Sequence, residues 1–131
     1  MDVFSAELVP GSRLAERYAL IITGRKAFIS FRTAGEVLYG ALRRVWGTAR
    51  MLKLDTKMQQ AEVVHTGPEL VLVCAQLRAD CEAAGHALAQ REHNADRWIA
   101  ATALRLGIPL VSNDGIFRGV PGLALESVAS A

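Results

Sequence analysis

Three acidic residues stand where helices should begin or strands should end, and acids in such places can bind metal ions. Glu36 follows the apolar stretch AFISF (27–31), Asp96 opens a helical segment that contains WIAATAL, and Asp114 follows the apolar stretch IPLVS. Carboxylates that converge within a few ångströms repel one another and stay ionised together only when cations sit among them. The matching cation is Mg²⁺ or Mn²⁺, which takes oxygen ligands and keeps positions open for water.

Each acid also has an ordinary explanation. Glu36 could complete a T-x-x-E capping box with Thr33 as the N-cap of its helix. Asp96 could be a first-turn acid favoured by the helix dipole, worth about 0.3–1 kcal/mol. The NDG sequence at 113–115 could be a simple turn. For each acid taken singly, the ordinary explanation is the better one. Taken together, these explanations account less well for the placement of all three acids at one edge of the predicted sheet.

The elements that must position these acids form an alternating series of strands and helices. Such a series predicts βαβ units, an α/β fold with a mostly parallel sheet and helices on both faces. In sheets of this kind ligands bind beyond the carboxyl ends of the strands, which places the three acids together. The expected strands are 27–31, 62–65, 108–112 and a shorter one within 122–127, and the expected helices are 12–22, 33–47, 48–60, 68–84 and 94–106.

Local signals support several of these helices. The second helix carries one apolar stripe, and in the fourth an apolar face continues to a stop at Gly85. Asn94 is a good N-cap for the last long helix, and Gly107 suits its C-terminal end. The stripe of the second helix consists of Val37, Leu38, Ala41, Leu42 and Val45, and the face of the fourth consists of Leu70, Cys74, Leu77, Cys81 and Ala84.

Bulk properties fit one globular domain spanning 1–131. The chain has 131 residues, 51% of them hydrophobic and 21% charged. We expect a cytoplasmic protein, because no basic region precedes an apolar run at the N-terminus and no apolar run approaches the roughly 20 residues of a membrane span. Cys74 and Cys81 lie seven residues apart in a helical pattern, which separates their Cα atoms by about 10 Å and excludes a disulfide between them.

Basic residues concentrate in one part of the chain. The formal net charge is +2, yet from Arg25 to Lys57 eight basic residues face two acidic ones. Arg43, Arg50 and Lys57 recur every seven residues, so they form a row if the helices that carry them are collinear, a condition that Gly47 could break. Such a row could follow an RNA backbone. Ordinary solvated surface charge is the alternative, and both interpretations stay open.

The motifs resemble those of a known family. ISFRTAGEVLYGA, HNADRWIAATALRLGIPLVSND and DGIFRGVPGL look like the motifs of PIN-domain ribonucleases, specifically the VapC toxins of bacterial toxin-antitoxin pairs, in the same order over nearly the whole chain. The resemblance implies a three-layer α/β/α fold and an endoribonuclease that uses Mg²⁺ or Mn²⁺ held by a quartet of acids. By motif, Glu36, Asp96 and Asp114 match three of these acids, and Ser112 and Asn113 occupy the small polar positions beside the last.

The fourth acid of the family ends its first strand, and here the match is incomplete. The chain begins MDVFS, which aligns with the latter half of that motif. Either Asp2 shifts to serve as the fourth metal ligand, or the leading aspartate lies upstream of Met1 and the first strand is truncated. We favour the late start, because a parallel sheet without its central strand leaves backbone groups unpaired. The chain would then be inactive or dependent on a partner.

The resemblance also implies a mechanism and partners. The metal, held by the leading aspartate or Asp2 together with Asp96 and Asp114, activates a water, and Glu36 orients or deprotonates it. We expect a homodimer, an RNA substrate and a cognate VapB-like antitoxin whose tail covers the active groove. The alternative is a catalytically inactive or truncated PIN module that binds antitoxin or RNA without cleaving it.

Overall fold

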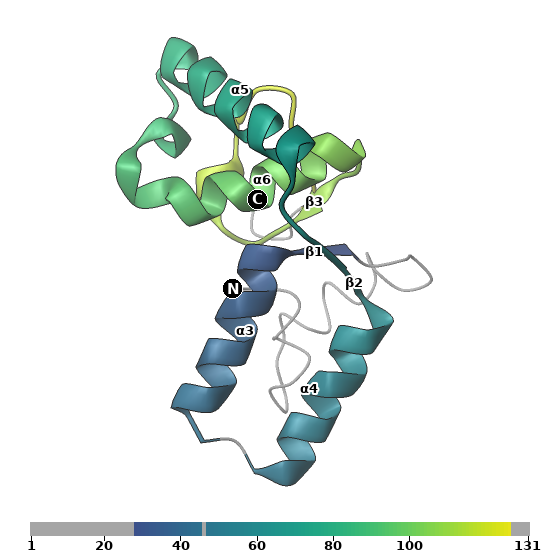
Figure 1. Cartoon of the computed structure of the whole chain (residues 1–131). Helices are drawn as coiled ribbons and strands as arrows, with labels where there is room; N and C mark the ends of the chain where they lie inside the picture. The colour runs from purple at the N-terminus through teal and green to yellow at the C-terminus, as the bar shows by residue number, and fades with distance from the viewer. Residues whose placement is uncertain (1–27, 46, 127–131) are drawn as a thin grey trace. The chain divides into compact units, whose positions relative to one another are not determined.

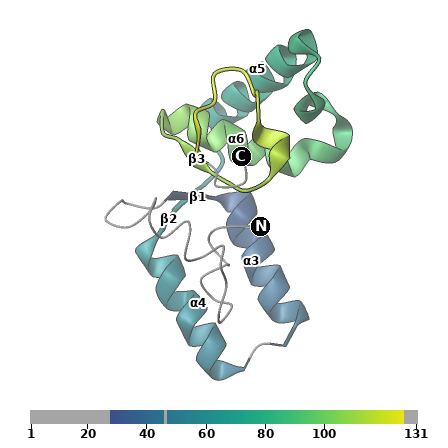
Figure 2. The same ribbon diagram turned by 180° about the vertical axis from the view of Figure 1, so that it is seen from behind.

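A computed structural model describes residues 28–45 and 47–126 of the chain. The chain divides into two compact units, with the first extending to Val64 and the second starting at His65, and each is described by itself. Figures 1 and 2 show the ribbon from opposite sides. Asp2, the expected helix at 12–22 and any first strand before it lie outside the described residues.

The first unit is a helical hairpin whose ends carry two short parallel strands. β1 (Phe28–Ser30) leads into α3 (Phe31–Arg43), which is followed by α4 (Thr48–Gln60) and β2 (Glu62–Val64). β1 pairs with β2 in parallel, with Ile29 opposite Val63. The helices therefore run in opposite directions between the strands, as Figure 1 shows.

Side chains at helical spacing hold the hairpin together. Val37 and Ala41 of α3 are buried against Leu54 of α4, with Met51 packed beside them. Leu38, Leu42 and Val45 are exposed, so only two of the five residues of the predicted stripe are buried. An apolar stripe of that width covers more of the helix surface than one neighbouring helix can bury.

The two ends of α3 differ from their predicted positions. Ser30 is the N-cap, and its hydroxyl accepts a hydrogen bond from the backbone N–H of Arg32 at 3.1 Å. The predicted capping box of Thr33 and Glu36 is therefore wrong, because the helix begins at Phe31, and Glu36 lies in the second turn. The helix ends at Arg43 rather than at Gly47.

The second unit packs two long helices together beside a pair of short strands. β3 and β4 are parallel, with Leu110 opposite Leu125 and Val111 opposite Glu126. In chain order the elements are α5 (Pro68–Ala84), the 3₁₀ turns η1 (Ala87–Ala89) and η2 (Arg91–His93), α6 (Asn94–Leu106), β3 (Leu110–Val111), the 3₁₀ turn η3 (Gly115–Phe117) and β4 (Leu125–Glu126).

The helices of this unit confirm the sequence signals closely. The predicted face of α5 is buried at Leu70, Cys74, Leu77 and Cys81, although Ala84 is exposed. α6 contacts α5, and its small side chains Ala100, Ala101 and Ala103 are buried. Gly85 and Gly107 close the two helices in the left-handed region, at φ 69° and 65°, which glycine adopts without a Cβ penalty.

The class of fold predicted from the alternating elements is confirmed. Helices alternate with strands, and both observed strand pairs are parallel. The strands are shorter than predicted: β3 has two residues, both half-buried, where a buried strand over 108–112 was expected. In the stretches 28–45 and 47–126, no helix combines the length and apolarity needed to span a membrane. That the chain forms one domain over 1–131 stays a prediction.

Candidate active site

Asp96 lies in the first turn of α6, as predicted, but the start of this helix differs in detail. His93 is the N-cap, and Asn94 is the first helical residue with φ −58° and ψ −45°. The prediction of Asn94 as N-cap is therefore wrong. Its Oδ1 instead accepts a long hydrogen bond of 3.4 Å from the guanidinium of Arg97, one turn later.

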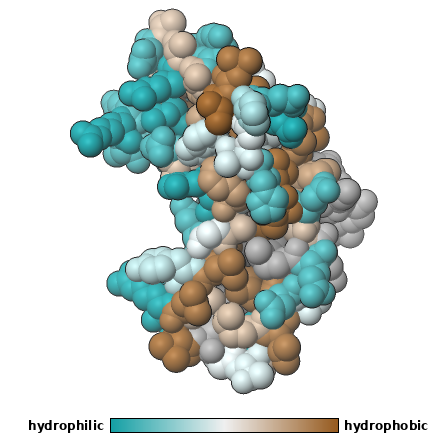
Figure 3. Space-filling model, viewed as in Figure 1, coloured by the Kyte–Doolittle hydropathy of each residue, from teal (hydrophilic) through white to brown (hydrophobic). Residues whose placement is uncertain are grey.

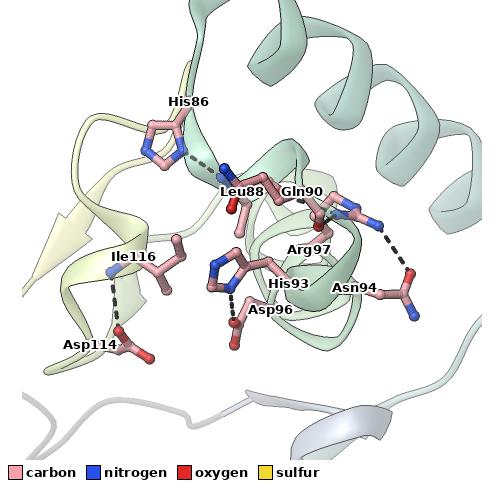
Figure 4. A network of polar contacts seen from close by, with 9 residues as sticks. All are labelled: His86, Leu88, Gln90, His93, Asn94, Asp96, Arg97, Asp114 and Ile116. Atoms are coloured by element: carbon pink, nitrogen blue, oxygen red, sulfur yellow. Dashed lines mark hydrogen bonds and ion pairs between the residues drawn. The ribbon is translucent and has the colours of Figure 1, made fainter.

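The imidazole of His93 contacts the carboxylate of Asp96. Nδ1 lies 3.1 Å from Oδ2, and the two side chains are 27% and 29% exposed. Residues three apart at a helix start face the same side, which brings the groups together. Figure 4 shows the pair at the start of α6. Within the described part of the chain, nothing is hydrogen-bonded to the other oxygen, Oδ1 of Asp96.

Arg97, the next residue after Asp96, is buried and holds the preceding turns against α6. Its side chain is 3% exposed. The guanidinium donates to the carbonyl oxygen of Leu88 at 2.9 Å and to that of Gln90 at 2.6 Å. Hydrogen bonds from a charged group to carbonyls offset part of the cost of burying it. The backbone that leads to His93 and Asp96 is thereby tied to the helix itself.

Asp114 stands in a tight turn after β3. Its backbone N–H donates to Oγ of Ser112 at 3.1 Å, and its own Oδ1 accepts from the N–H of Ile116 at 3.1 Å. Ser112 is buried, whereas Asn113 and Asp114 are exposed. The turn proposed for NDG is confirmed, and it occupies one oxygen of the carboxylate. No described residue hydrogen-bonds to Oδ2 of Asp114.

A histidine links the segments that carry these two acids. Nδ1 of His86 accepts from the N–H of Leu88 at 3.0 Å, which makes it the N-cap of η1. Because Nδ1 accepts, Nε2 carries the proton and donates to the carbonyl oxygen of Arg118 at 2.7 Å. His86 therefore joins η1, before α6, to the chain just after η3. Figure 4 shows His86, Asp96 and Asp114 in one view of this unit.

The predicted site residues are distributed over both units. Asp96, Ser112, Asn113 and Asp114 belong to the second, and Glu36 is an exposed residue of α3 in the first. Of the side chains in 28–45 and 47–126, no three His, Cys, Asp or Glu form a group that could hold a metal ion. The joint site of Glu36, Asp96 and Asp114 therefore stays a prediction.

The basic row predicted along one helix is interrupted. Arg43 is the last residue of α3, whereas Arg50 belongs to α4, which runs in the opposite direction. The condition of collinear helices is therefore not met, and Gly47, the suspected point of the break, directly precedes α4. Arg43 and Arg50 are both exposed, and the side chain of Lys57 lies outside the described part of the structure. A role for these residues in binding RNA stays a prediction.

The donor groups in the second unit suit a hard divalent cation. Asp96 and Asp114 each hold one carboxylate oxygen in a hydrogen bond and leave the other for a ligand. Carboxylate oxygens are the ligands that Mg²⁺ and Mn²⁺ prefer. Sequence reasoning missed His86, His93 and Arg97. The available signal was the spacing of His93 and Asp96, three residues apart at a helix start.

Comparisons with known proteins agree with this architecture. The family model described as PIN domain matches residues 3–123. No curated protein gives a significant match. Solved structures of VapBC proteins are among those similar to the chain.

A chain of DNA-bound VapBC from Salmonella typhimurium is 25% identical with a TM-score of 0.72, over 95% of this chain and 89% of that one. For VapBC2 from Rickettsia felis bound to a DNA fragment from their promoter, the identity is 24% and the TM-score 0.69, over 87% and 83% of the two chains. For VapBC-1 from nontypeable Haemophilus influenzae, the sequence identity is 20% and the TM-score 0.65, over 86% of this chain and 82% of that one.

Proposed function

Since the chain belongs to the PIN domain family, we propose that it is a VapC-like toxin, a metal-dependent endoribonuclease that hydrolyses RNA phosphodiester bonds and is neutralised by a cognate VapB-like antitoxin. PIN domains are typically nucleases, which supports the class of reaction. One observation carries the proposal: Asp96 and Asp114 each leave one carboxylate oxygen without a hydrogen bond from the described residues, in a unit that holds both acids by their other oxygen. Carboxylate oxygens of this kind are the donor type that Mg²⁺ and Mn²⁺ take.

Each acid has a separate task in the proposed reaction. Asp96 and Asp114 hold the cation, with Asp2 as a further ligand. When bound, the cation lowers the pKa of a water and stabilises negative charge on the phosphate. Glu36 accepts the proton of the attacking water, a task that suits an exposed carboxylate on the second turn of α3. The His93 ring bonds to the carboxylate of Asp96, and the Ser112 hydroxyl accepts from the backbone N–H of Asp114; neither side chain reacts.

RNA is the proposed substrate, and basic and small polar side chains are its proposed contacts. Arg43 and Arg50 are exposed and attract the phosphate backbone by charge, a sequence-independent term that weakens with salt. Lys57 is proposed as a third contact to the phosphate backbone. Asn113 is exposed beside Asp114, and Ser112 shapes the turn that presents it.

An antitoxin is the proposed protein partner. The similar solved structures are VapBC structures. The first unit also carries apolar side chains on its outside, and brown residues gather over α3 and α4 in Figure 3. We name this patch the apolar α3–α4 surface and assign it to the antitoxin; its members are Leu38, Tyr39, Leu42, Val45 and Leu52. Assembly as a homodimer is part of the same proposal.

One assay separates a nuclease from a module that only binds. Purified chain is incubated with a mixture of structured RNAs in Mg²⁺, in Mn²⁺ and in excess EDTA, with and without the protein encoded next to it. Cleavage that needs the cation and stops when the adjacently encoded protein, the candidate antitoxin, is added supports the toxin proposal. RNA binding without cleavage in either metal contradicts it and favours the inactive PIN module.

A further inference from the structure

The His93 ring has a defined protonation at the nitrogen that faces Asp96. Nδ1 lies 3.1 Å from Oδ2 of Asp96. An ionised carboxylate only accepts hydrogen bonds, so Nδ1 carries a proton whether the ring is neutral or charged. Both forms of the ring therefore donate to the same oxygen.

The pair is not explained by the usual hydrogen bonds of a helix start. An N-cap side chain normally accepts from a backbone N–H of the first turn, but the imidazole of His93 makes no such bond. An acid at the third helical position normally bonds back to the N-cap N–H. Here that N–H, of His93, donates to the carbonyl oxygen of Gln90 at 3.0 Å. The two side chains thus bond to each other in place of capping α6.

The backbone beneath the pair is fixed from the other side. Arg97 donates to the carbonyl oxygens of Leu88 and Gln90, so the turn that precedes His93 is bonded to the helix that carries Asp96. A donor on a fixed backbone limits the rotation of the carboxylate that it contacts. A metal ligand that is oriented before the cation arrives loses less conformational entropy on binding it.

Resting on the proposed function, we infer that His93 is a positioning residue for the metal site. Nδ1–H donates to Oδ2 of Asp96, which holds the carboxylate in one orientation and leaves Oδ1 for the divalent cation. His93 itself touches neither RNA nor the reacting phosphate in this role. The inferred effect is on the affinity for the metal first and on cleavage only as a consequence.

The test measures Mn²⁺ binding to the full chain by calorimetry, with no RNA present. His93→Ala is expected to raise the Mn²⁺ Kd about 10-fold, at the low end of the loss typical for partners of metal ligands. His93→Asn keeps a donor, Nδ2, at the place of Nδ1 and is expected to restore most of the affinity. His65→Ala, at an exposed histidine, is expected to leave the Kd unchanged.

A stability control comes from the same helix. Oγ1 of the buried Thr102 donates to the carbonyl oxygen of Trp98 at 2.8 Å, so Thr102→Val removes an internal contact of α6 away from the acids. If this variant and His93→Ala lose similar melting temperature and similar Mn²⁺ affinity, the effect is structural and the inference is overturned.

The remaining outcomes separate this inference from the proposed function. Wild-type binding of Mn²⁺ that Asp96→Asn abolishes, combined with unchanged affinity in His93→Ala, overturns the role of His93 and leaves the nuclease proposal standing. A wild-type chain that binds no Mn²⁺ overturns both. Weaker binding in His93→Ala with recovery in His93→Asn supports the inference.

Discussion

Nε2 of His86 lies 2.7 Å from the backbone carbonyl oxygen of Arg118, and the same ring caps η1 through Nδ1. One side chain thus joins two segments 32 residues apart, one on each side of the acids of the second unit. His86→Ala removes both bonds, and we expect it to lower the free energy of unfolding by about 1–2 kcal/mol. Urea denaturation followed by circular dichroism measures the loss.

Two conservative variants of His86 separate its bonds. Asparagine offers an oxygen near the place of Nδ1 and keeps the cap of η1, whereas glutamine offers a donor near the place of Nε2 and keeps the bond to Arg118. Each is therefore expected to recover part of the stability. Equal stability of wild type and His86→Ala would show that neither bond contributes.

Substitution of the metal-binding acids is expected to abolish cleavage while the chain stays folded. Asp96→Asn removes a charge that the proposed cation needs but keeps a side chain of the same size, so RNA cleavage is expected to fall by at least about 100-fold. Asp114→Asn is expected to act in the same direction. Asp80→Asn, at an exposed acid of α5 outside the proposed site, is the matched control. Wild-type cleavage rates in Asp96→Asn with an unchanged melting curve would remove this residue from the mechanism.

The long helices of the second unit were predictable because their signals are redundant. In α5 the apolar face from Leu70 to Cys81 and the stop at Gly85 point to the same helix. The start of α3 was not predictable from the sequence. Ser30 and Thr33 are both good N-caps, and the sequence does not say which hydroxyl is placed to accept a hydrogen bond from the backbone. Ser30 is the cap because it ends β1, where the chain turns into the helix.

In the candidate site, the positions of the acids could be predicted from local sequence, whereas their hydrogen-bond partners could not. Asp96 in the first turn of α6 and Asp114 after β3 follow from local signals, and both were predicted. The partners of the acids depend on tertiary detail. The guanidinium of Arg97 bonds to carbonyls of the turns before α6, and the ring of His86 bonds to a carbonyl far along the chain. No residue pattern indicates such pairs.

Val45 holds a backbone conformation that suits glycine. It follows the C-cap of α3 with φ 52°, in the left-handed region where a β-branched residue costs about 1–2 kcal/mol. Its side chain is 84% exposed, so little packing is lost on removing it. Val45→Gly is expected to raise the free energy of unfolding by about 1 kcal/mol, after the entropic cost of glycine.

Alanine at the same position is the control for this prediction. Val45→Ala removes the apolar branches but keeps a Cβ, so most of the conformational penalty should remain. Thermal and urea unfolding of the two variants compare the effects. A glycine variant no more stable than the alanine variant would show that the backbone at Val45 is not strained.

The apolar α3–α4 surface is expected to carry antitoxin affinity rather than stability. Leu42 is 70% and Leu52 61% exposed, so replacing either by a charged residue removes little from the core. Leu42→Glu and Leu52→Glu are expected to weaken binding of the neighbouring protein by about 10-fold or more, because each buries a charge in an apolar contact. Surface plasmon resonance measures the affinity. Val71→Glu, at an exposed apolar residue of α5, is the matched control; equal losses in all three variants would contradict the assignment of this surface.

The two buried cysteines are expected to make the stability of the fold decrease at alkaline pH. Burial raises the pKa of the thiols of Cys74 and Cys81, and neither is in a disulfide. In the unfolded chain a thiol loses its proton at about pH 8.5, whereas the folded chain retains it to higher pH. The unfolded state therefore binds fewer protons above that pH, and the linkage relation makes stability fall as pH rises.

We expect the free energy of unfolding, measured in urea with reductant present, to decline from pH 8.5 upwards. A variant with Cys74→Ala and Cys81→Ala should be less stable at neutral pH, because buried sulfur is lost, but its stability should decline less between pH 8.5 and pH 10. Each wild-type thiol should also react slowly with an alkylating reagent at neutral pH, since the thiolate is the nucleophile and both cysteines are buried. Rapid alkylation of the folded chain at pH 7, or identical pH slopes for wild type and the double variant, would contradict the raised pKa values.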